Sequence, residues 1–175
     1  GARRVITFCP ECHHTLKEIY PRVVPGFDME VVNLSQLVGQ AVLEGKLRLS
    51  PGEEKFTYHD PCKLVRFSKV IEEPRAVVQA CGGLSEMPRS GTSSACCGNP
   101  CWANCDDDTK RWQVERLREA RETGAGMLVT ACPKCYVHLS CAQKEYGTHK
   151  GRERIALIDL HVLAASRILK ANRGP

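Results

Sequence analysis

The sequence predicts an α/β fold in which helices flank a mainly parallel sheet. Short apolar segments alternate along the chain with longer segments that carry helix start and stop signals. The same strand and helix order also occurs twice, in two distant parts of the chain. Strands that alternate with helices pair in parallel, so their carboxyl ends share one edge of the sheet. The 175 residues, 42% of them hydrophobic and 26% charged, suffice for a domain with a real core.

Proline and glycine delimit the first strand and helix of the second half. Residues 55–59 are predicted to form a strand that ends before Asp60-Pro61. A helix is expected from about Glu73-Pro74 to Gly82-Gly83, because proline fits the first helical turn and glycine ends a helix. A short strand is expected over residues 84–87.

A further helix, strand and helix complete this half. The acidic residues 106–109 predict a helix N-terminus, since carboxylates are favourable at that end of the helix dipole. Gly124 is the expected C-terminal cap of this helix. Residues 127–130 form the next predicted strand, and a helix is expected to begin at Cys132.

The chain contains an internal duplication centred on two CxxC motifs. Residues 5–16 match residues 128–139, and after a variable loop residues 31–37 match residues 157–163. Each of the later segments is a short apolar strand followed by an Asn or Asp in a helix-capping position. The sequence therefore predicts two pseudo-repeated, Rossmann-like βαβ units with a parallel sheet and flanking helices.

The two units are unequal in length. Residues 51–175 are predicted to be a complete second unit, whereas residues 1–50 correspond only to the C-terminal part of the first. The first unit is therefore incomplete, and Cys9 and Cys12 lack the upstream cysteines that the second unit has. These two thiols are either a partial second metal site or a vestige of one.

The number of cysteines points to metal or redox chemistry. The chain has 11 cysteines, an odd number, and its start lacks the apolar stretch of a signal peptide, so a disulfide scaffold fits poorly. No apolar run approaches the roughly 18 to 20 residues that span a bilayer. We therefore predict a cytoplasmic protein without direct membrane insertion, which could associate with a membrane through a partner subunit.

The charge distribution does not indicate a nucleic-acid partner. The formal net charge of +5 is small and scattered. Basic residues gather mainly over residues 110–121, where glutamates are interleaved with them. This pattern is typical of a solvated helix face.

Five cysteines of the second unit are predicted to form one metal site. Cys62 follows one predicted strand, Cys96 and Cys97 lie in a loop rich in Gly, Ser and Thr, and Cys132 and Cys135 follow another strand. Adjacent cysteines rarely both bind one tetrahedral ion, whereas an iron–sulfur cluster offers several metal corners. The pattern favours a cluster, with zinc as the alternative.

Four histidines lie near these cysteines. His59 could donate a hydrogen bond to a cluster sulfur or act as a proton donor to a substrate thiolate; alternatively, it ends a strand with its ring satisfied locally. His13, His14 and His138 follow the CxxC pairs and are expected either to support the site or to lie on helix surfaces.

The remaining cysteines fall outside the repeated pattern. Cys81 and Cys141 are expected to be buried small side chains. Cys101 and Cys105 follow the adjacent pair closely, so either could be an extra ligand. Gly98 would let the backbone turn tightly and approach a bulky cluster, or is a simple loop glycine.

The motifs resemble those of the CCG cysteine-rich domain found in heterodisulfide reductase-type proteins. The residues that carry the resemblance are His59-Asp-Pro-Cys62, Cys96-Cys-Gly98 and Thr130-Ala-Cys-Pro-Lys-Cys135. Cys9-Pro-Glu-Cys12 is similar to the end of a preceding copy. The chain departs from the family in its missing first half, in a short second spacer and in Pro100-Cys101, where many relatives have glycine-rich sequence.

The resemblance implies a cofactor and its ligands. By this likeness the five cysteines of the second unit hold a non-cubane [4Fe–4S] cluster that cleaves a disulfide in two one-electron steps. Cys9 and Cys12 would belong to a second cluster whose other ligands are absent from this sequence.

Three functions remain open at this point. The first is an iron–sulfur oxidoreductase subunit, heterodisulfide reductase-like, that acts on a thiol or disulfide substrate. The second is an electron-relay subunit of a dehydrogenase or a quinone-linked complex, and the third is a structural zinc-binding module. The sequence has no GxGxxG or phosphate-loop motif, so a flavoprotein or ferredoxin-like electron donor would have to be another subunit of the complex.

Overall fold

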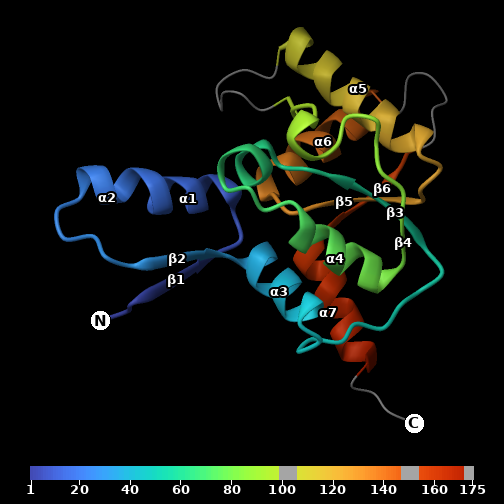
Figure 1. Ribbon diagram of the computed structural model, residues 1–175. Coiled ribbons are helices and arrows are strands. Elements are labelled where there is room, and N and C mark those ends of the chain that lie inside the picture. The colour runs from blue at the N-terminus through green and yellow to red at the C-terminus, as the bar shows by residue number, and fades with distance from the viewer. Residues whose placement is uncertain (99–105, 147–153, 172–175) are drawn as a thin grey trace.

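The computed structural model describes residues 1–98, 106–146 and 154–171. Two parallel sheets organise the chain, as Figure 1 shows. The smaller sheet pairs β1 (Arg4–Thr7) with β2 (Glu30–Asn33). The larger sheet has the order β4 (Gly83–Leu84), β3 (Lys55–His59), β5 (Met127–Thr130), β6 (Ala156–Asp159). Every strand pair in both sheets is parallel, which confirms the predicted fold class.

The helices follow the strands in the predicted alternation. The α-helices are α1 (Pro10–His14), α2 (Tyr20–Val23), α3 (Leu34–Leu43), α4 (Glu72–Cys81), α5 (Asp107–Glu122), α6 (Pro133–Tyr146) and α7 (Leu160–Ala171). Two π-helical turns, η1 (Thr15–Ile19) and η2 (Lys63–Phe67), and a 3₁₀ turn, η3 (Gly91–Ser93), complete the set. Within the described ranges, no helix is both long enough and apolar enough to cross a membrane.

The larger sheet is covered by helices on both faces. In Figure 1, α5 and α6 lie on one side of this sheet, and α3, α4 and α7 gather on the other. Side chains alternate along a strand, so Val129 of β5 packs toward α4 and α7 while Leu128 packs toward α5 and α6. The core on the α5 and α6 side also contains three of the candidate ligands, Cys97, Cys132 and Cys135.

The two CxxC segments have the same strand register. Thr7 of β1 pairs with Asn33 of β2, and the matching residue Thr130 of β5 pairs with Asp159 of β6. Both capping predictions are confirmed, because Asn33 accepts a hydrogen bond of 2.9 Å from the backbone of Ser35 and Asp159 accepts one of 2.8 Å from that of His161. The boundary between the units at residues 50 and 51 stays a prediction.

The predicted ends of most other elements are confirmed. β3 ends at His59, α4 ends before Gly82, and β5 covers residues 127–130. The Asp106 side chain caps α5 by accepting a bond of 2.8 Å from the Thr109 backbone. Gly124 has a φ of +71° just after α5, as a C-terminal cap requires.

Two expectations about secondary structure and exposure are wrong. The strand expected over residues 84–87 is only Gly83–Leu84, because the chain leaves β3 after Ser85 and buries Met87 between the sheet and α5. The predicted solvated face of residues 110–121 includes Arg116, which is 0% exposed. Its charge is balanced inside the protein by Glu119, whose carboxylate lies 2.5 Å away.

Candidate metal centre

Five cysteines from three segments of the chain line one cavity. They are Cys62, Cys96, Cys97, Cys132 and Cys135. None of the cysteines that the structure describes forms a disulfide. The thiols that the sequence assigns to one site are therefore brought together, although nothing in the structure tests which of them bind metal.

The ends of two parallel strands position Cys62 and Cys132. His59 at the end of β3 pairs with Thr130 at the end of β5, so both chain segments leave the sheet at the same level. Cys62 directly precedes η2, and Cys132 directly precedes α6. Both thiols consequently emerge at the carboxyl edge of the sheet, as the strand order predicted.

The position of the adjacent cysteines Cys96 and Cys97 depends on Gly98, which follows them. Gly98 has a φ of +74°, and a Cβ atom built on it would lie 2.7 Å from the carbonyl oxygen of Thr109 and 2.8 Å from Cγ of Gln113. The predicted tight turn at this glycine is confirmed by its positive φ, whereas its approach to a cluster stays a prediction. Any larger residue would push the Cys96-Cys97 loop away from this helix.

A buried ion pair holds the segment that leads into this loop. Asp60 is 0% exposed and accepts bonds of 2.8 and 2.9 Å from the guanidinium of Arg75. The same carboxylate accepts a bond of 2.7 Å from the backbone of Gly91, and Ser94 donates a bond of 3.1 Å to the Asp60 carbonyl. Sequence reasoning missed these residues; the only available signal was the position of Asp60 beside Pro61 and Cys62.

Crowding changes the acidity of the thiols. A hydrogen bond from Cys135, with backbone N–H groups at the start of α6, lowers the pKa of Cys132 to about 7. The hydrogen bond to Cys96 raises the pKa of Cys62, and burial adds to this effect. Bonds to Cys132 and Cys97 together with burial raise that of Cys135. For Cys97, the bond from Cys135 favours the thiolate, but Cys96 and burial outweigh it and raise its pKa to about 12.

This pattern of acidity fits a cationic metal centre. Without positive charge, close thiols suppress one another's ionisation, so few of them are thiolates at neutral pH. A bound metal supplies that charge and favours thiolate ligands. The donor set, all sulfur and supplied from three segments, suits an iron–sulfur cluster.

His59 lies beside the cysteines and is 1% exposed. One of its ring nitrogens and the Sγ atoms of Cys97 and Cys135 all lie within 4.8 Å of one another. Its Nδ1 accepts a bond of 2.9 Å from Nε of Arg116, whereas its Nε2 is buried without a hydrogen-bond partner among the described residues. Burial and the Arg116 charge lower its pKa to about 3, so the ring is neutral. Among the described residues, the His59 ring thus has a hydrogen-bond partner at one of its two nitrogens only.

Two lysines line the cavity together with the thiols. They are Lys63, whose ammonium lies 4.1 Å from the centroid of the Phe67 ring, and Lys134. Lys134 also pairs with Glu11, which lies between Cys9 and Cys12. This ion pair links the first CxxC segment to the second and neutralises the Lys134 charge, so Lys63 is the lining lysine that places positive charge beside a site that would carry several thiolates.

The first CxxC pair lies next to the five-cysteine cavity but does not line it. Cys9 is half-buried and Cys12 is exposed, whereas Pro10 and Glu11 between them line the cavity. Partial desolvation of the Cys12 thiol raises its pKa, and the hydrogen bond to Cys9 and the proximity of Cys132 add to this effect. The two CxxC segments are therefore neighbours in space.

The other three histidines near the CxxC pairs pack against neighbouring elements. His13 is fully buried, with Nδ1 2.9 Å from Oγ of Ser68, so its expected surface position is wrong. His14 packs against Phe67, and Nδ1 of His138 lies 3.2 Å from Nε2 of Gln113. These contacts replace the expected exposed surface because α1 packs on η2 and α6 packs on α5.

Cys81 is fully buried in the core, as predicted. Cys141 is only half-buried, because its thiol lies between Lys110 at 3.3 Å and Glu145 at 3.2 Å, so the prediction that it is buried is wrong. Cys101 and Cys105, the predicted extra ligands, lie outside the residues that the structure describes.

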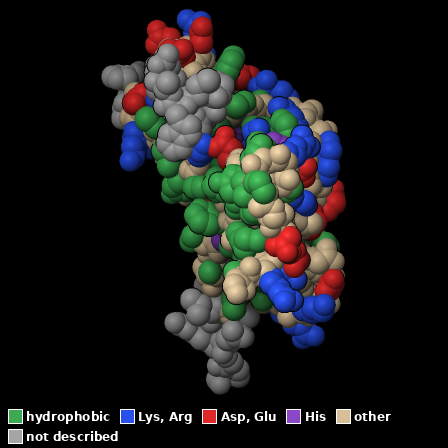
Figure 2. All heavy atoms as spheres, turned by 90° about the vertical axis from the view of Figure 1, so that its left-hand side faces the viewer, with side chains coloured by type: hydrophobic (Ala, Val, Ile, Leu, Met, Phe, Trp, Pro, Cys, Tyr) green, Lys and Arg blue, Asp and Glu red, His purple; other side chains and the backbone are tan. Residues whose placement is uncertain are grey.

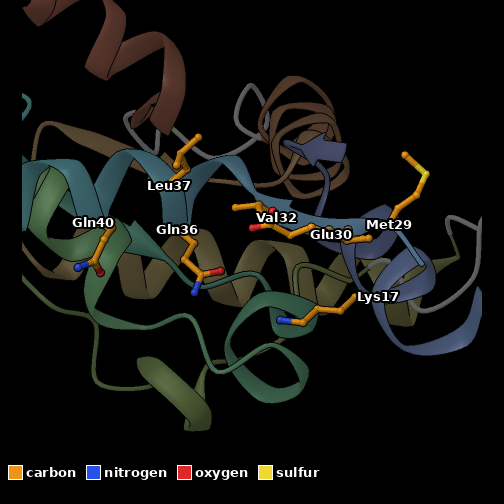
Figure 3. Close-up of a pocket in the computed structure, with 8 residues that line it drawn as sticks. Lys17, Met29, Glu30, Val32, Gln36, Leu37 and Gln40 are labelled. Atoms are coloured by element: carbon orange, nitrogen blue, oxygen red, sulfur yellow. The ribbon is translucent and has the colours of Figure 1, made fainter. Parts of the chain in front are cut away.

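A separate hollow lies on the smaller sheet, between β2, α3 and η1 (Figure 3). Its polar side chains include Lys17, Glu30, Gln36 and Gln40, and no cysteine or histidine among the described residues lines it. Glu30 is paired with Arg4 at 2.6 Å. This hollow therefore has no cluster of metal-binding or nucleophilic groups comparable to that at the five cysteines.

The cysteine site coincides with a known domain. Residues 56–140 match the family model described as the CCG cysteine-rich domain. This segment belongs to the CCG family. The CCG domain includes all five cysteines of the cavity together with His59, and it begins after the first CxxC pair.

Relatives of the chain bear the names of ferredoxins, iron–sulfur-binding oxidoreductases and heterodisulfide reductases. It is 38% identical over 138 residues to a "Probable membrane-anchored ferredoxin" of Chromohalobacter salexigens, covering 75% of this chain and 21% of that protein. It is 32% identical over 146 residues to a subunit of the dihydromethanophenazine:CoB--CoM heterodisulfide reductase of Methanosarcina barkeri, covering 80% and 36%. It is 28% identical over 176 residues to the "Probable iron-sulfur-binding oxidoreductase FadF" of Bacillus subtilis, covering 97% and 24%. The chain thus matches only between 21% and 36% of the length of these relatives.

Proposed function

We propose that this chain is part of an iron–sulfur oxidoreductase of the heterodisulfide reductase type. One observation carries the proposal: five cysteines of a CCG domain line a single cavity at the carboxyl edge of a parallel sheet. The names of the relatives support an iron–sulfur cofactor. The finer assignment, a [4Fe–4S] cluster of the non-cubane type held by all five thiols, rests on the family likeness and on the ligand chemistry.

When bound, such a cluster would supply one-electron transfer and iron positions that can accept a substrate sulfur. The residues of this chain would supply the rest. Cys62, Cys96, Cys97, Cys132 and Cys135 would hold the cluster, and the neutral ring of His59 would present an N–H group to it. Helices α5 and α6 would cover the inner side and exclude water, while Lys63 would favour an anionic substrate.

A thiol or disulfide is the proposed substrate. A thiolate matches both the positive charge of Lys63 in the cavity and the affinity of iron for sulfur. The relative from M. barkeri bears the name of a heterodisulfide reductase, which supports this substrate class. The two electrons that reduce the disulfide would arrive one at a time, while both substrate sulfurs remain close to the cluster.

We further propose that Cys9 and Cys12 are half of a second metal site. They begin a CxxC segment with the same register as the second one, and they lie beside the five-cysteine cavity. The missing ligands would come from a part of the protein or from a partner that supplies the upstream half of a CCG unit.

Redox partners are part of this proposal. The apolar surface of the first unit supports a docked neighbour: Figure 2 shows hydrophobic side chains gathered on the face that includes it, and Phe8 and Val23 are 57% and 64% exposed. A flavoprotein or ferredoxin-like subunit would deliver electrons. We propose a cytoplasmic position, with any contact to a membrane made through such a partner; one relative carries the words "membrane-anchored" in its name.

A second function, electron relay without substrate chemistry, is supported by other relatives. One is named "EtfAB:quinone oxidoreductase" and is 33% identical over 146 residues. Electron paramagnetic resonance of anaerobically prepared protein separates the two functions. We expect a cluster signal that changes on addition of a thiol or disulfide. A signal that responds to neither compound would favour electron relay. The absence of any cluster signal would contradict both functions.

A further inference from the structure

The two ring nitrogens of His59 have different surroundings. Nδ1 is bonded to Nε of Arg116 at 2.9 Å, while Nε2 is buried without a partner among the described residues. A buried N–H or lone pair without a partner is unfavourable, so an unpaired nitrogen next to a candidate metal site requires an explanation.

Arg116 is held firmly in its position on α5. Its Nη1 donates a bond of 2.8 Å to the carbonyl oxygen of Arg89 and one of 2.5 Å to Glu119, and Nη2 donates one of 3.3 Å to Ser94. The residue is 0% exposed. Its Nε–H is therefore aimed at His59 by bonds at the other end of the guanidinium.

The chemistry of arginine decides the tautomer of His59. A guanidinium has only donors and keeps its charge, so the group that faces its Nε–H must offer a lone pair. Nδ1 of His59 is consequently unprotonated, and the proton of the neutral ring lies on Nε2. The buried, unpaired Nε2 is therefore an N–H donor that needs an acceptor.

We propose that Arg116 is a positioning residue that locks His59 as an Nε2–H hydrogen-bond donor to a sulfur atom of the metal centre. This inference rests on the proposed cluster site, since that site supplies the acceptor. The Sγ atoms of Cys97 and Cys135 lie within 4.8 Å of a ring nitrogen but do not bond Nε2, so a cluster sulfur held beside these cysteines would be the acceptor. His59 is then not a metal ligand, because its Nε2 has no lone pair and its Nδ1 is occupied.

The hydrogen bond that Arg116 and His59 would provide affects the electron affinity of the cluster. A hydrogen bond to a cluster sulfur stabilises the reduced form, which carries more negative charge, and therefore raises the reduction potential. Removal of either His59 or Arg116 should make the cluster harder to reduce. A role confined to folding would not move the potential of protein that retains its iron.

Matched variants measure this effect by redox titration of the cluster signal. His59→Leu should shift the midpoint potential to a more negative value at unchanged iron and sulfide content, whereas His59→Gln keeps an N–H in the ring position and should recover part of the shift. The double variant Arg116→Met/Glu119→Gln removes a charge of each sign and should also lower the potential. Arg89→Met, which removes a cation paired with the same Glu119 but not with His59, should leave it nearly unchanged.

A second measurement needs no stable variant at this site. Nitrogen spectra of ¹⁵N-histidine-labelled, oxidised, cluster-loaded chain should show an unprotonated Nδ1 and a protonated Nε2 for His59. A protonated Nδ1, or a potential in His59→Leu equal to that of the unmodified chain, would overturn the proposal. An unmodified chain that binds no iron would instead contradict the proposed function, and nitrogen spectra of that metal-free chain would still test whether Arg116 fixes the His59 tautomer.

Discussion

The carboxylate of Asp60 and the guanidinium of Arg75 form a two-bond ion pair beneath the cysteine site, at 2.8 and 2.9 Å. Asp60 is 0% exposed and lies two residues before Cys62, and Arg75 comes from α4. The same carboxylate binds the backbone of Gly91. This pair therefore fixes the turn that carries Cys62 relative to the loop that carries the adjacent cysteines.

Removal of Arg75 should destabilise the fold. Arg75→Met would leave the buried Asp60 carboxylate without its cation, and breaking such a pair costs roughly 3 to 5 kcal/mol. Urea unfolding followed by circular dichroism measures the loss. Arg118→Met is the control, since Arg118 pairs with Glu115 and Glu122 at the exposed surface of α5 and its loss should hardly move the midpoint. Equal effects of both variants would contradict a structural role for the buried pair.

Gly98 should tolerate alanine less well than Gly124 does. Both glycines have positive φ angles, +74° and +71°, so alanine at either position costs roughly 1 to 2 kcal/mol of backbone strain. Only at Gly98 would the new Cβ also collide with α5, 2.7 Å from the Thr109 carbonyl oxygen. Unfolding free energies of the two variants should therefore differ, and Gly98→Ala should also retain less iron. Similar losses of stability would show that the loop moves away without penalty.

The caps of α3 and α7 should be interchangeable. Asp159→Ala should lose about 1 kcal/mol with the capping bond, whereas Asp159→Asn should keep it, as Asn33 does in the first unit. Burial acts to raise the pKa of Asp159, but its bonds from His161 and Val162 outweigh this and lower it below the ordinary 3.8. The ionised cap is thus fully stabilising above pH 3.8 and is lost as the pH falls through the lowered pKa. Unfolding at several pH values should show this acid loss in the unmodified chain and not in Asp159→Asn.

Cysteine variants should separate ligands from other thiols. Cys97→Ser should lose most of the bound iron, because Cys97 lines the cavity and lies in the core beside Cys135. Cys141→Ser should keep it, since Cys141 is half-buried away from the cavity between Lys110 and Glu145. Iron analysis after desalting, at matched helix content, makes the comparison. Equal retention by both variants would refute the ligand assignment.

The sequence was sufficient to predict the fold class and the convergence of the five cysteines. Strand and helix alternation implies parallel strands, and thiols that follow two such strands must emerge at one edge. The matching CxxC segments also predicted the capping roles of Asn33 and Asp159, because those roles depend on local hydrogen bonds. Capping hydrogen bonds of this kind can be predicted from the sequence alone.

The support around the site was not predictable in the same way. Arg116 lies among alternating charges on α5, a pattern that indicates a solvated face, yet it is buried against His59 and Glu119. Most partners of Arg116 come from segments far away in the chain, and Asp60, a partner of Arg75, lies in a different element from α4, so periodicity gives no signal for these contacts. β4 is likewise short because Met87 is drawn into the core, which depends on tertiary packing.

The five-cysteine cavity is proposed to hold an iron–sulfur cluster, and one elemental analysis tests this directly. Iron, acid-labile sulfide and zinc should be quantified on the same sample of anaerobically prepared protein. We expect about four irons with matching sulfide for the complete site, and little zinc. Stoichiometric zinc without sulfide would contradict the claim and assign the CCG domain of this chain a structural role.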